Sequence, residues 1–358
     1  MSTALDLKRQ YNKGKRKKTL VIFSLFVALI VSIVASVSLG AASPGFLEAS
    51  QVIFYKIFPF FPHNLMPHTT EVIVFDLRLP RIIMAILAGA GLAAAGATMQ
   101  GTLRNPLVSS YVLGISSAAG FGAALAIVFG IGVIAIVGDY LVIMNAFLFS
   151  VIAMVIVYVI ARIRGMSSET VILVGVAVGF LFSALLSLIQ YVAPQYQAVS
   201  AVVFWLMGSL TSATWENILV VLPVVIVTVV LMTQQAWNIN LLSMGEDVAK
   251  SLGVNSKRVL ATNMVLETLA TACIIAFTGV IGFVDLIAPH IARMVIGNDH
   301  RFLIPCSALI GAFLLLCSDT VARLVIAPTE LPVGIVTSLL GVPFFIYIMI
   351  NKRRQSFR

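Results

Sequence analysis

Three acidic residues stand inside long apolar stretches of this 358-residue sequence, namely Glu267, Asp285 and Asp319. An ionisable side chain at membrane depth is costly, so it indicates either a functional group such as a proton relay or a group with internal partners. Asp285 and Asp319 fall near the expected ends of apolar helices, and Glu267 alone would be a poor relay. We therefore interpret all three as structural hydrogen-bonding groups, with proton-coupled transport as the alternative.

Other residue types that could do chemistry give weaker signals. All three cysteines fall in apolar runs without a CxxC spacing, which predicts neither a disulfide nor a metal site: Cys273, Cys306 and Cys317. His290 is expected to cap or pack a helix rather than to bind haem, and His63 and His68 have no metal-ligand spacing. The motifs H-E-x-x-H, G-x-S-x-G and G-x-x-x-x-G-K-[ST] are absent from the sequence. We expect no catalytic residue, no bound metal and no cofactor or ATP held by this chain.

The composition places these residues in a membrane protein. The chain is 60% hydrophobic and only 10% charged, whereas soluble domains carry about 25% charged residues. No water-soluble fold could bury so much apolar surface, so the lipid bilayer must be its solvent. The net charge of +9 lies in short segments between apolar runs, which is typical of a membrane face rather than of a nucleic-acid interface. No nucleic-acid partner is expected.

Spanning helices need about 20 apolar residues each, and the sequence predicts about ten. We expect them at 19–41, 80–100, 110–132, 139–162, 169–192, 215–236, 258–281, 283–297, 302–324 and 332–351. A basic tail (1–18) precedes a single transmembrane domain (19–351), and a second basic tail (352–358) follows it. A cleaved signal peptide is the alternative for the first run, which is longer than the usual apolar core of such peptides.

The distribution of basic residues sets the expected orientation. With the N-terminus in the cytoplasm, 19 of the 23 Lys and Arg residues fall on the cytoplasmic side. Both termini are therefore expected in the cytoplasm of a cell that carries the protein in its plasma membrane. Outside, Phe46–Phe61 is expected to lie along the membrane interface, and 194–213 to form a short surface helix. Spans two to five and seven to ten suggest a weak inverted repeat, with Gly and Pro interruptions at matching positions.

The polar segment 241–256 links the sixth and seventh expected spans on the cytoplasmic side. Ser243 and Glu246 have the spacing of a helix capping box, and Gly253 could close that helix in the left-handed conformation. Asn255 or Ser256 could then cap the next span. An apolar stripe recurs at four-residue spacing: Met244, Val248 and Leu252. The segment is either an ordinary structured loop or a rigid knob that fits a groove in a soluble partner.

The motif Gly245-Glu-Asp-x-Ala249-x-x-Leu252-Gly253 resembles the coupling helix of the FecCD family of ABC importer permeases, which includes the vitamin B12 permease. Further stretches match in family order over about residues 75–350: Asp76-Leu-Arg-Leu-Pro-Arg81, Ala88–Gly96, Met99-Gln-Gly101, Asn105-Pro-Leu107, Leu113–Ser117, Gly282-Phe283, Ala288-Pro-His290, Asp299-His-Arg301, Asp319, Ala322-Arg323 and Glu330-Leu-Pro-x-Gly334. Each is weak alone, and together they are specific. The first seventy residues match only in type.

The resemblance implies an all-α, ten-helix permease of the ABC type II importer class. Its partners would be a second copy of itself, two copies of a separate ATPase that binds ATP and Mg, and an external binding protein. The residues that would transmit ATPase movement are Ser243, Gly245, Glu246, Asp247, Ala249, Leu252 and Gly253. The expected cargo is an iron(III)–siderophore complex, with cobalamin, haem or molybdate as alternatives. An ion-driven secondary transporter is the rival from another class.

Three arginines are expected on the external side. By the resemblance, Arg78, Arg81 and Arg323 would receive acidic side chains of the binding protein. The planar guanidinium suits this role because it fixes the register of a carboxylate as well as attracting it. Contacts with lipid headgroups are the alternative, and Asp76 or Glu71 could instead pair with these arginines within the chain.

The fifth and tenth spans line the translocation path in the family. Gly175 and Gly179, four residues apart, permit close approach of another element. The candidate path residues are small or polar: Ser183, Ser187, Gln190, Thr337 and Ser338. Packing of helices against one another is an equal alternative for these residues.

Overall fold

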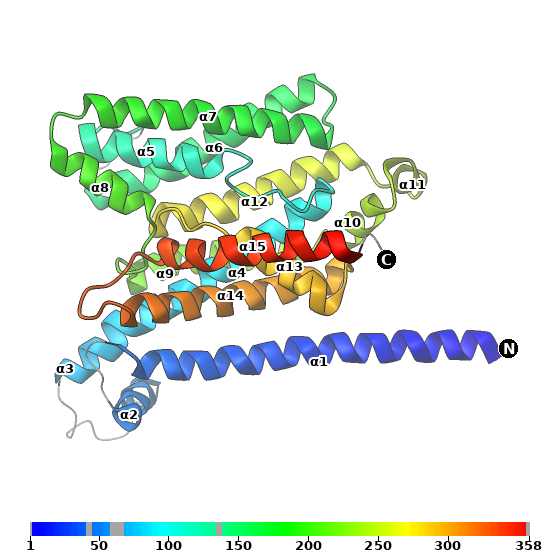
Figure 1. Cartoon of the computed structure of the whole chain (residues 1–358), viewed down its shortest axis with the longest axis horizontal. Coiled ribbons are helices and arrows are strands. Elements are labelled where there is room, and N and C mark those ends of the chain that lie inside the picture. The colour runs from blue at the N-terminus through cyan, green and yellow to red at the C-terminus, as the bar shows by residue number, and fades with distance from the viewer. Residues whose placement is uncertain (1, 41–44, 58–67, 134–137, 356–358) are drawn as a thin grey trace.

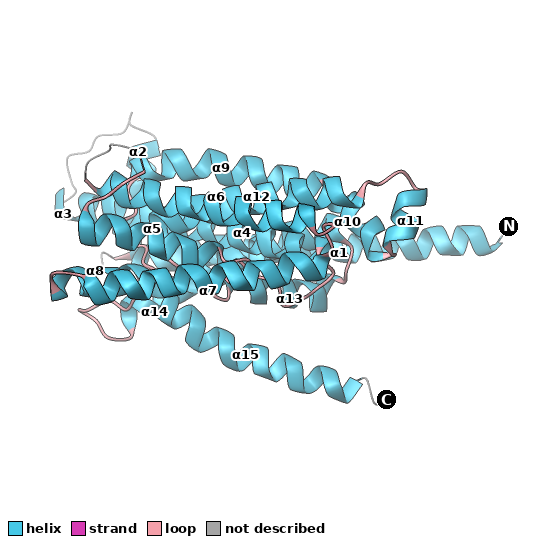
Figure 2. Ribbon diagram, turned by 90° about the horizontal axis from the view of Figure 1, so that it is seen from above, coloured by secondary structure: helices cyan, strands magenta, loops and turns pink. Residues whose placement is uncertain are grey.

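The computed structural model describes residues 2–40, 45–57, 68–133 and 138–355, and in these ranges the regular structure is helical (Figures 1 and 2). The first half contains α1 (Ser2–Ser38), α2 (Phe46–Ile57), α3 (His68–Glu71), the π-helix η1 (Val72–Arg78), α4 (Leu79–Thr102), α5 (Ile115–Phe129), α6 (Asp139–Ile163) and α7 (Ser168–Val192). The second half contains α8 (Tyr196–Leu206), α9 (Trp215–Gln234), α10 (Ala236–Ser243), α11 (Glu246–Ser251), α12 (Ser256–Thr278), α13 (Val284–Ile296), α14 (His300–Leu324) and α15 (Val333–Gln355).

A helix occupies each of the ten predicted positions. Within the described residues, seven helical stretches are long and apolar enough to cross a membrane: Gly14–Ser38, His68–Thr102, Tyr140–Ile163, Ser168–Val192, Trp215–Gln234, Ser256–Thr278 and His300–Leu324. Helix α5 and the apolar part of α15 are shorter. Helix α13 has 13 residues, or about 20 Å of rise, so it spans only part of the hydrocarbon layer. The chain is thus an all-helical integral membrane protein, as its composition predicts.

The N-terminal basic segment is part of the first helix. Helix α1 begins at Ser2 rather than at residue 19, so the backbone of the predicted tail continues the helix. Near its other end, Leu29 and Val37 join the main hydrophobic core. The segment predicted to lie along the membrane interface is helical over Phe46–Ile57, while 58–61 lies outside the described residues. The expected surface helix within 194–213 is α8.

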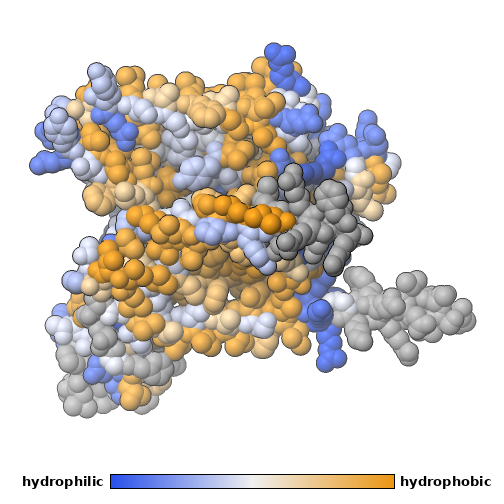
Figure 3. Space-filling model, viewed as in Figure 1, coloured by the Kyte–Doolittle hydropathy of each residue, from blue (hydrophilic) through white to orange (hydrophobic). Residues whose placement is uncertain are grey.

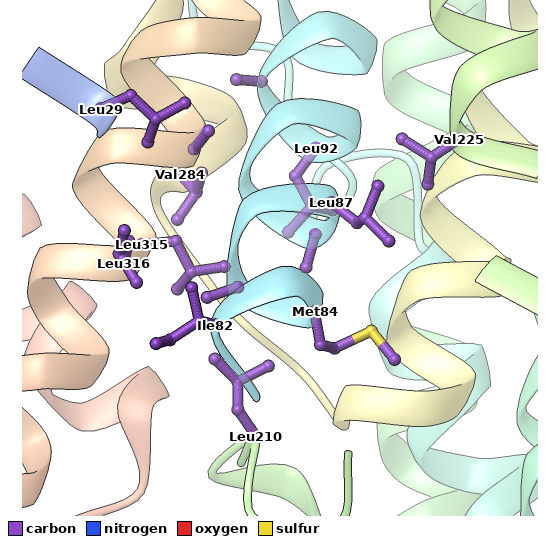
Figure 4. Packing of buried hydrophobic residues seen from close by; sticks show 14 of the residues in the cluster. Leu29, Ile82, Met84, Leu87, Leu92, Leu210, Val225, Val284, Leu315 and Leu316 are labelled. Carbon is purple, nitrogen blue, oxygen red and sulfur yellow. The ribbon is translucent and has the colours of Figure 1, made fainter. Parts of the chain in front are cut away.

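Helix α4 lies at the centre of the bundle, and its small residues explain that position. Helix α14 approaches so closely that a Cβ atom on Gly89 would lie 2.3 Å from the carbonyl oxygen of Gly311. Backbones can approach this closely only where side chains are absent, as at small-residue interfaces of membrane helices. Around this contact, Ile82 and Leu87 of α4 pack in one core with Leu315 of α14 (Figure 4). The glycine-rich run therefore serves packing.

The predicted repeat is visible in the order of elements. Both α4–α7 and α12–α15 consist of a long helix, a non-helical segment, a short helix and two long helices. The non-helical segments are 103–114 and 279–283. Helices α4 and α12 run in opposite directions (Figure 1), which is the arrangement expected of an inverted repeat. The two halves meet where a Cβ on Gly96 would lie 1.9 Å from the carbonyl oxygen of Asp285.

The two ends of the bundle differ in what they present. The N-terminal end of α1, the C-terminal end of α15, and helices α10 and α11 lie at one end, which we name the α11 end (Figure 1). Helices α2, α3 and α8 lie at the opposite end, which we name the α8 end. Apolar residues cover much of the length between them on the face shown in Figure 3. This is the surface pattern of a protein that crosses a bilayer.

Candidate functional site

Helix α11 stands at the tip of the α11 end as a short projection bounded by two glycines. Gly245 precedes it with φ +117° and Gly253 follows it with φ +83°. No atom within 4 Å would meet a Cβ at either position. Glycine is therefore required by the backbone conformation rather than by lack of space. The prediction that Gly253 ends this helix in the left-handed region is confirmed.

The predicted capping box is wrong. Ser243 is the last residue of α10, and its hydroxyl donates to the carbonyl oxygen of Asn240 at 2.6 Å. The chain turns at Met244, so Ser243 precedes the turn and Gly245 takes the N-cap position of α11 without a side-chain hydrogen bond. The cap of the next helix is as expected, because Asn255 Oδ1 accepts from the backbone N–H of Arg258 at 3.1 Å.

One face of α11 is buried and the other is open. Ala249 is fully buried and packs in a small core with Leu242 and Val259. The predicted apolar stripe points outward, with Met244 and Leu252 67% and 60% exposed. Val248 and the acidic Glu246 and Asp247 are also exposed. The buried alanine thus packs the base of the projection against α10 and α12. The opposite face of α11 presents apolar and acidic side chains to the surroundings.

Asn240 connects this projection to the long helix α14. Its Nδ2 donates to Asp299 Oδ1 at 2.8 Å, and its Oδ1 accepts from the backbone N–H of His300 at 2.9 Å. Hydrogen bonds from Arg301 hold the pKa of the Asp299 carboxyl at about 2, below its usual range, so Asp299 stays ionised as an acceptor. Arg301 also lies over the ring of Trp237 in α10, 4.9 Å from its centroid. Sequence reasoning missed Asn240, which no motif singled out.

At the α8 end, two of the predicted docking arginines share one buried carboxylate. Arg81 Nε donates to Asp319 Oδ1 at 2.8 Å, and Arg81 Nη1 donates to Glu330 Oε2. Arg323 Nε lies 3.2 Å from Asp319 Oδ2, which is an ion pair without hydrogen-bond geometry. Asp319 is fully buried, so each guanidinium compensates a charge that has lost its water. Sequence reasoning did not identify Glu330 as a partner.

The arginines at this end also close the last turn of α1. Arg78 Nη1 donates to the carbonyl oxygen of Val37, and Arg323 Nη1 donates to that of Leu39 at 3.1 Å. Arg323 Nη2 donates to the hydroxyl of Ser36 at 2.6 Å. The last carbonyls of a helix have no partner within the helix, and they carry a partial negative charge. The arginines at the end of α1 supply both the missing hydrogen-bond donors and a positive charge.

All three arginines predicted to dock the binding protein are buried at the α8 end. Arg78, Arg81 and Arg323 are 7%, 8% and 6% exposed. The carboxylates that contact Arg81 are Asp319 and Glu330, whereas Glu71 contacts Lys56 at 2.6 Å. The role of these arginines in capturing a binding protein stays a prediction, and the contacts above give each of them a role within the chain.

A second buried polar cluster lies where the two repeats meet. Asp285, in the first turn of α13, accepts from both the backbone N–H and the hydroxyl of Ser110 at 2.8 Å. Gln100 at the end of α4 donates to the carbonyl oxygens of Val108 and Asp285, and it accepts from Arg293 Nη2 at 2.6 Å. These bonds give hydrogen-bond partners to backbone groups of the non-helical segments. Lipid could not supply such partners in the membrane interior.

The three intramembrane acids have different outcomes. Asp285 and Asp319 have internal partners, as predicted. Glu267 is buried, and its Oε2 has no hydrogen-bond partner within the described part of the chain. The interpretation of Glu267 as a hydrogen-bonded structural group therefore lacks support from these contacts. His290 Nδ1 lies 2.9 Å from the carbonyl oxygen of Leu286, and its ring meets Phe345 edge-on, which is the packing role expected.

The candidate path residues are not alike. Ser183 and Ser187 are exposed on α7, and Gln190 is partly exposed. Thr337 is buried within α15 and donates to the carbonyl oxygen of Gly334, as does the partly buried Ser338. The serines of α7 are thus accessible on the surface of the chain and Thr337 is not, and the place of these residues in a translocation path stays a prediction. Gly175 and Gly179 receive the turn around Gly114, because a Cβ on Gly114 would lie 2.9 Å from the nitrogen of Gly179.

The cysteines and histidines singled out in the sequence form no metal-binding cluster among the described residues. The three cysteines are unpaired. No set of three or more His, Cys, Asp or Glu side chains in the described part of the chain could hold a metal ion. His68 is the first residue of α3, and His63 lies outside the described residues.

Comparison with known proteins agrees with this geometry. The model of the FecCD transport family matches residues 28–351. The hemin transport system permease HmuU of Yersinia pestis is 35% identical, covering 96% of this chain and 98% of its own. The Fe(3+)-citrate import system permease YfmE of Bacillus subtilis is 36% identical, covering 98% and 100%. The cobalamin import system permease BtuC of Halobacterium salinarum is 40% identical, covering 81% and 77%.

A solved structure shows the same fold. It is an inward-facing conformation of an ABC transporter described as metal-chelate type, with a TM-score of 0.78 and 33% identity, covering 93% of this chain and 99% of that one. Together with the exposed projection between α10 and α12, these likenesses decide the family: this chain is an integral membrane permease that belongs to the FecCD transport family.

Proposed function

We propose that this chain is the membrane subunit of an ABC importer that carries an iron(III) chelate of the siderophore type across the plasma membrane. Two copies would enclose the path, two ATPase subunits would bind ATP and Mg beneath them, and an external binding protein would deliver the cargo. The observation that carries the proposal is α11, an exposed projection with apolar and acidic side chains on a buried alanine base. Such a surface fits a groove in a soluble partner.

The proposed orientation places the α11 end in the cytoplasm. The N-terminal end of α1 and the C-terminal end of α15 lie at that end (Figure 1), and both sequence segments are rich in Lys and Arg. An excess of basic residues is typical of cytoplasmic loops. In this orientation the ATPase would meet α11. The binding protein would approach the α8 end.

Movement of the ATPase would pass from α11 to α14. Helix α11 packs on α10 and α12 through Ala249, and Asn240 joins α10 to the first residues of α14. Helix α14 crosses the bundle to the cluster around Asp319 at the other end. A push on α11 would therefore reach both membrane faces along one continuous helix, which is the geometry needed for alternating access.

The class of cargo is supported more strongly than its identity. The relatives named above carry hemin, Fe(3+)-citrate and cobalamin, all of them bulky metal complexes. Iron(III)–siderophore complexes belong to the same class, and haem, cobalamin or molybdate are the alternatives. Exposed Ser183 and Ser187 on α7 offer hydroxyls without charge, which suits a path that releases its cargo rather than retaining it.

The test of coupling is Glu246→Lys in liposomes that contain the permease, its ATPase and its binding protein. We expect uptake of the iron chelate to fall at least tenfold while ATP hydrolysis continues, because Glu246 is exposed on the surface proposed to meet the ATPase and forms no ion pair with the described residues. Glu169→Lys, an exposed acid on the first turn of α7, is the matched control and should keep normal uptake. Normal uptake by Glu246→Lys would remove α11 from the mechanism.

The ion-driven alternative is separated in the same liposomes. Ionophores that collapse the proton and sodium gradients should leave ATP-dependent uptake unchanged. Uptake that stops with the gradients, ATP still being present, would favour a secondary transporter.

Docking of the binding protein at the α8 end needs a test that leaves the arginine cluster intact. Asp76 is exposed two residues before Arg78, so Asp76→Cys can carry a photo-crosslinker without disturbing an internal contact of the arginines. We expect cargo-loaded binding protein to be captured there, and not by Lys250→Cys on α11. Failure of capture from Asp76→Cys, with uptake intact, would place docking elsewhere.

A further inference from the structure

A long apolar groove between α6 and α12 has no role in the proposed transport cycle. Its volume is about 530 Å³. The residues that line it come from two antiparallel helices: Val151, Met154, Val155 and Tyr158 of α6, and Ala261, Thr262, Met264, Val265, Leu266, Thr268 and Leu269 of α12. Val155 and Val265 remain 53% and 56% exposed, so the groove is open to the surroundings of the bundle.

The groove lies in one half of the bilayer. On α6 it extends from near the middle of the helix towards its C-terminal end, and on α12 from the first turns towards the middle. Both of those helix ends belong to the α11 end of the molecule (Figure 1). The eight residues from Val151 to Tyr158 span about 12 Å, which is close to the depth of one leaflet of hydrocarbon.

Basic residues gather where the groove meets the membrane surface. Arg162 is four residues beyond Tyr158 on α6, and Arg164 follows at its C-cap. Lys257 and Arg258 lie in the first turn of α12, just before Ala261. These four side chains are exposed, and none forms an ion pair with a carboxylate of the described residues. A cationic surface thus adjoins the end of an apolar channel.

The groove also faces away from the surface proposed to meet the second copy. In Figure 2, α6 and α12 lie towards one side of the bundle, and α7 and α15 towards the other. A dimer that encloses its path with α7 and α15 would leave the groove in contact with lipid.

We propose that this groove binds one anionic phospholipid from the leaflet at the α11 end. An acyl chain would lie between α6 and α12, and the phosphate would contact the four basic residues. The positive charge at the end of the groove favours this ligand, because basic pockets between membrane helices recruit acidic lipid headgroups. The length of the groove, close to the thickness of one leaflet, suits an acyl chain. Since α12 directly follows α11, the lipid would brace the base of the coupling projection.

The experiment uses the purified full-length permease in a non-ionic detergent. Dioleoyl phosphatidylglycerol and dioleoyl phosphatidylcholine are titrated separately, and bound lipid is counted by native mass spectrometry. We expect one phosphatidylglycerol per chain, held about tenfold more tightly than phosphatidylcholine. Arg162→Gln with Arg164→Gln, and Lys257→Gln with Arg258→Gln, should each abolish this preference. Val265→Trp, which fills the groove, should weaken retention of both lipids.

The matched control removes the same charge elsewhere at the α11 end. Lys15→Gln with Arg16→Gln, on exposed α1, should keep the wild-type preference. Equal affinity of the wild type for the two lipids, an equal loss in the control, or unchanged phosphatidylglycerol binding by Val265→Trp would each overturn the proposal. So would variants of the basic residues that lose affinity for the ATPase while retaining the lipid, because the charges would then belong to the protein partner.

Discussion

The two ends of this permease use charge in opposite ways. At the α8 end, Arg81 is buried against Asp319 and Glu330. Arg323 is buried against Asp319 and donates to the carbonyl oxygen of Leu39, just after α1. At the α11 end, Glu246 and Asp247 are exposed and contact no basic side chain of the described chain. The arginine cluster is compensated within the chain, whereas α11 presents charges that a second molecule could meet.

This difference separates stability from coupling. A buried ion pair is costly to break because it leaves an unpaired charge in a poorly solvated place. An exposed charge contributes little to folding, so it is free to serve recognition. Changes at the α8 end should therefore act on the free energy of unfolding, whereas changes on α11 should act on transport. Asn240 lies between the two cases, because it is partly buried and joins α10 to α14.

The largest effect on stability is expected from Arg81→Met. It removes the hydrogen-bonded partner of Asp319 and should lower the free energy of unfolding by about 3 kcal/mol. Equilibrium unfolding in mixed detergent micelles measures this loss. Arg16→Met, at an exposed position of α1, is the control and should change it by less than about 0.5 kcal/mol. Adding Asp319→Leu to Arg81→Met should restore part of the stability. A loss below 1 kcal/mol for Arg81→Met would contradict the assigned role.

Asn240→Ala should have an intermediate effect. It leaves the backbone N–H of His300 without its acceptor and removes one donor from Asp299. This should lower the free energy of unfolding by about 1–3 kcal/mol. It should also lower uptake at an unchanged rate of ATP hydrolysis, because α10 would no longer hold α14. Asn238→Ala is the matched control, since the Asn238 amide donates to Gln235 within the same helical segment and does not reach α14 among the described residues. Equal effects of the two substitutions on uptake would remove Asn240 from the path of coupling.

The smallest effect is expected at the end of α11. Gly253→Ala meets no neighbouring atom but must keep φ near +83°, so it should cost about 1 kcal/mol through backbone strain alone. Gly14→Ala in α1, which also meets no atom within 4 Å, should be neutral or slightly stabilising because alanine favours helix. Thermal unfolding of both variants in mild detergent checks the pair. Identical shifts for the two would show that the left-handed turn is not required.

Much of the fold could be predicted because the bilayer imposes simple local rules. A membrane helix needs a long apolar run and satisfies its own backbone, so the positions of the long helices follow from hydropathy. Helix α13 has only 13 residues, and its place among the predicted spans came from the distribution of basic residues. The glycine that ends α11 was also predictable, since the left-handed conformation favours that residue type. The motif around Gly245 identified the projection and its family, because its spacing is local in the chain.

The candidate site was predicted less completely, and the failures share a cause. The sequence placed Arg78, Arg81 and Arg323 at the α8 end, but not inside it. Arg81 contacts Asp319 across 238 residues, and Arg323 contacts Ser36 across 287. Ser243 failed as a cap for a more local reason, because the turn at Met244 separates it from α11.

The sequence by itself determined that this protein is a membrane protein. It also determined the positions of the long helices, the loops that carry charge and the segment that projects between α10 and α12. Only the tertiary structure decided which charges are compensated internally, which α4 glycines admit a neighbouring backbone, and that Asn240 joins α10 to α14. The physical reason is range: hydropathy and turn geometry act between residues a few positions apart, whereas the choice of partner for a buried charge depends on which distant helices pack together.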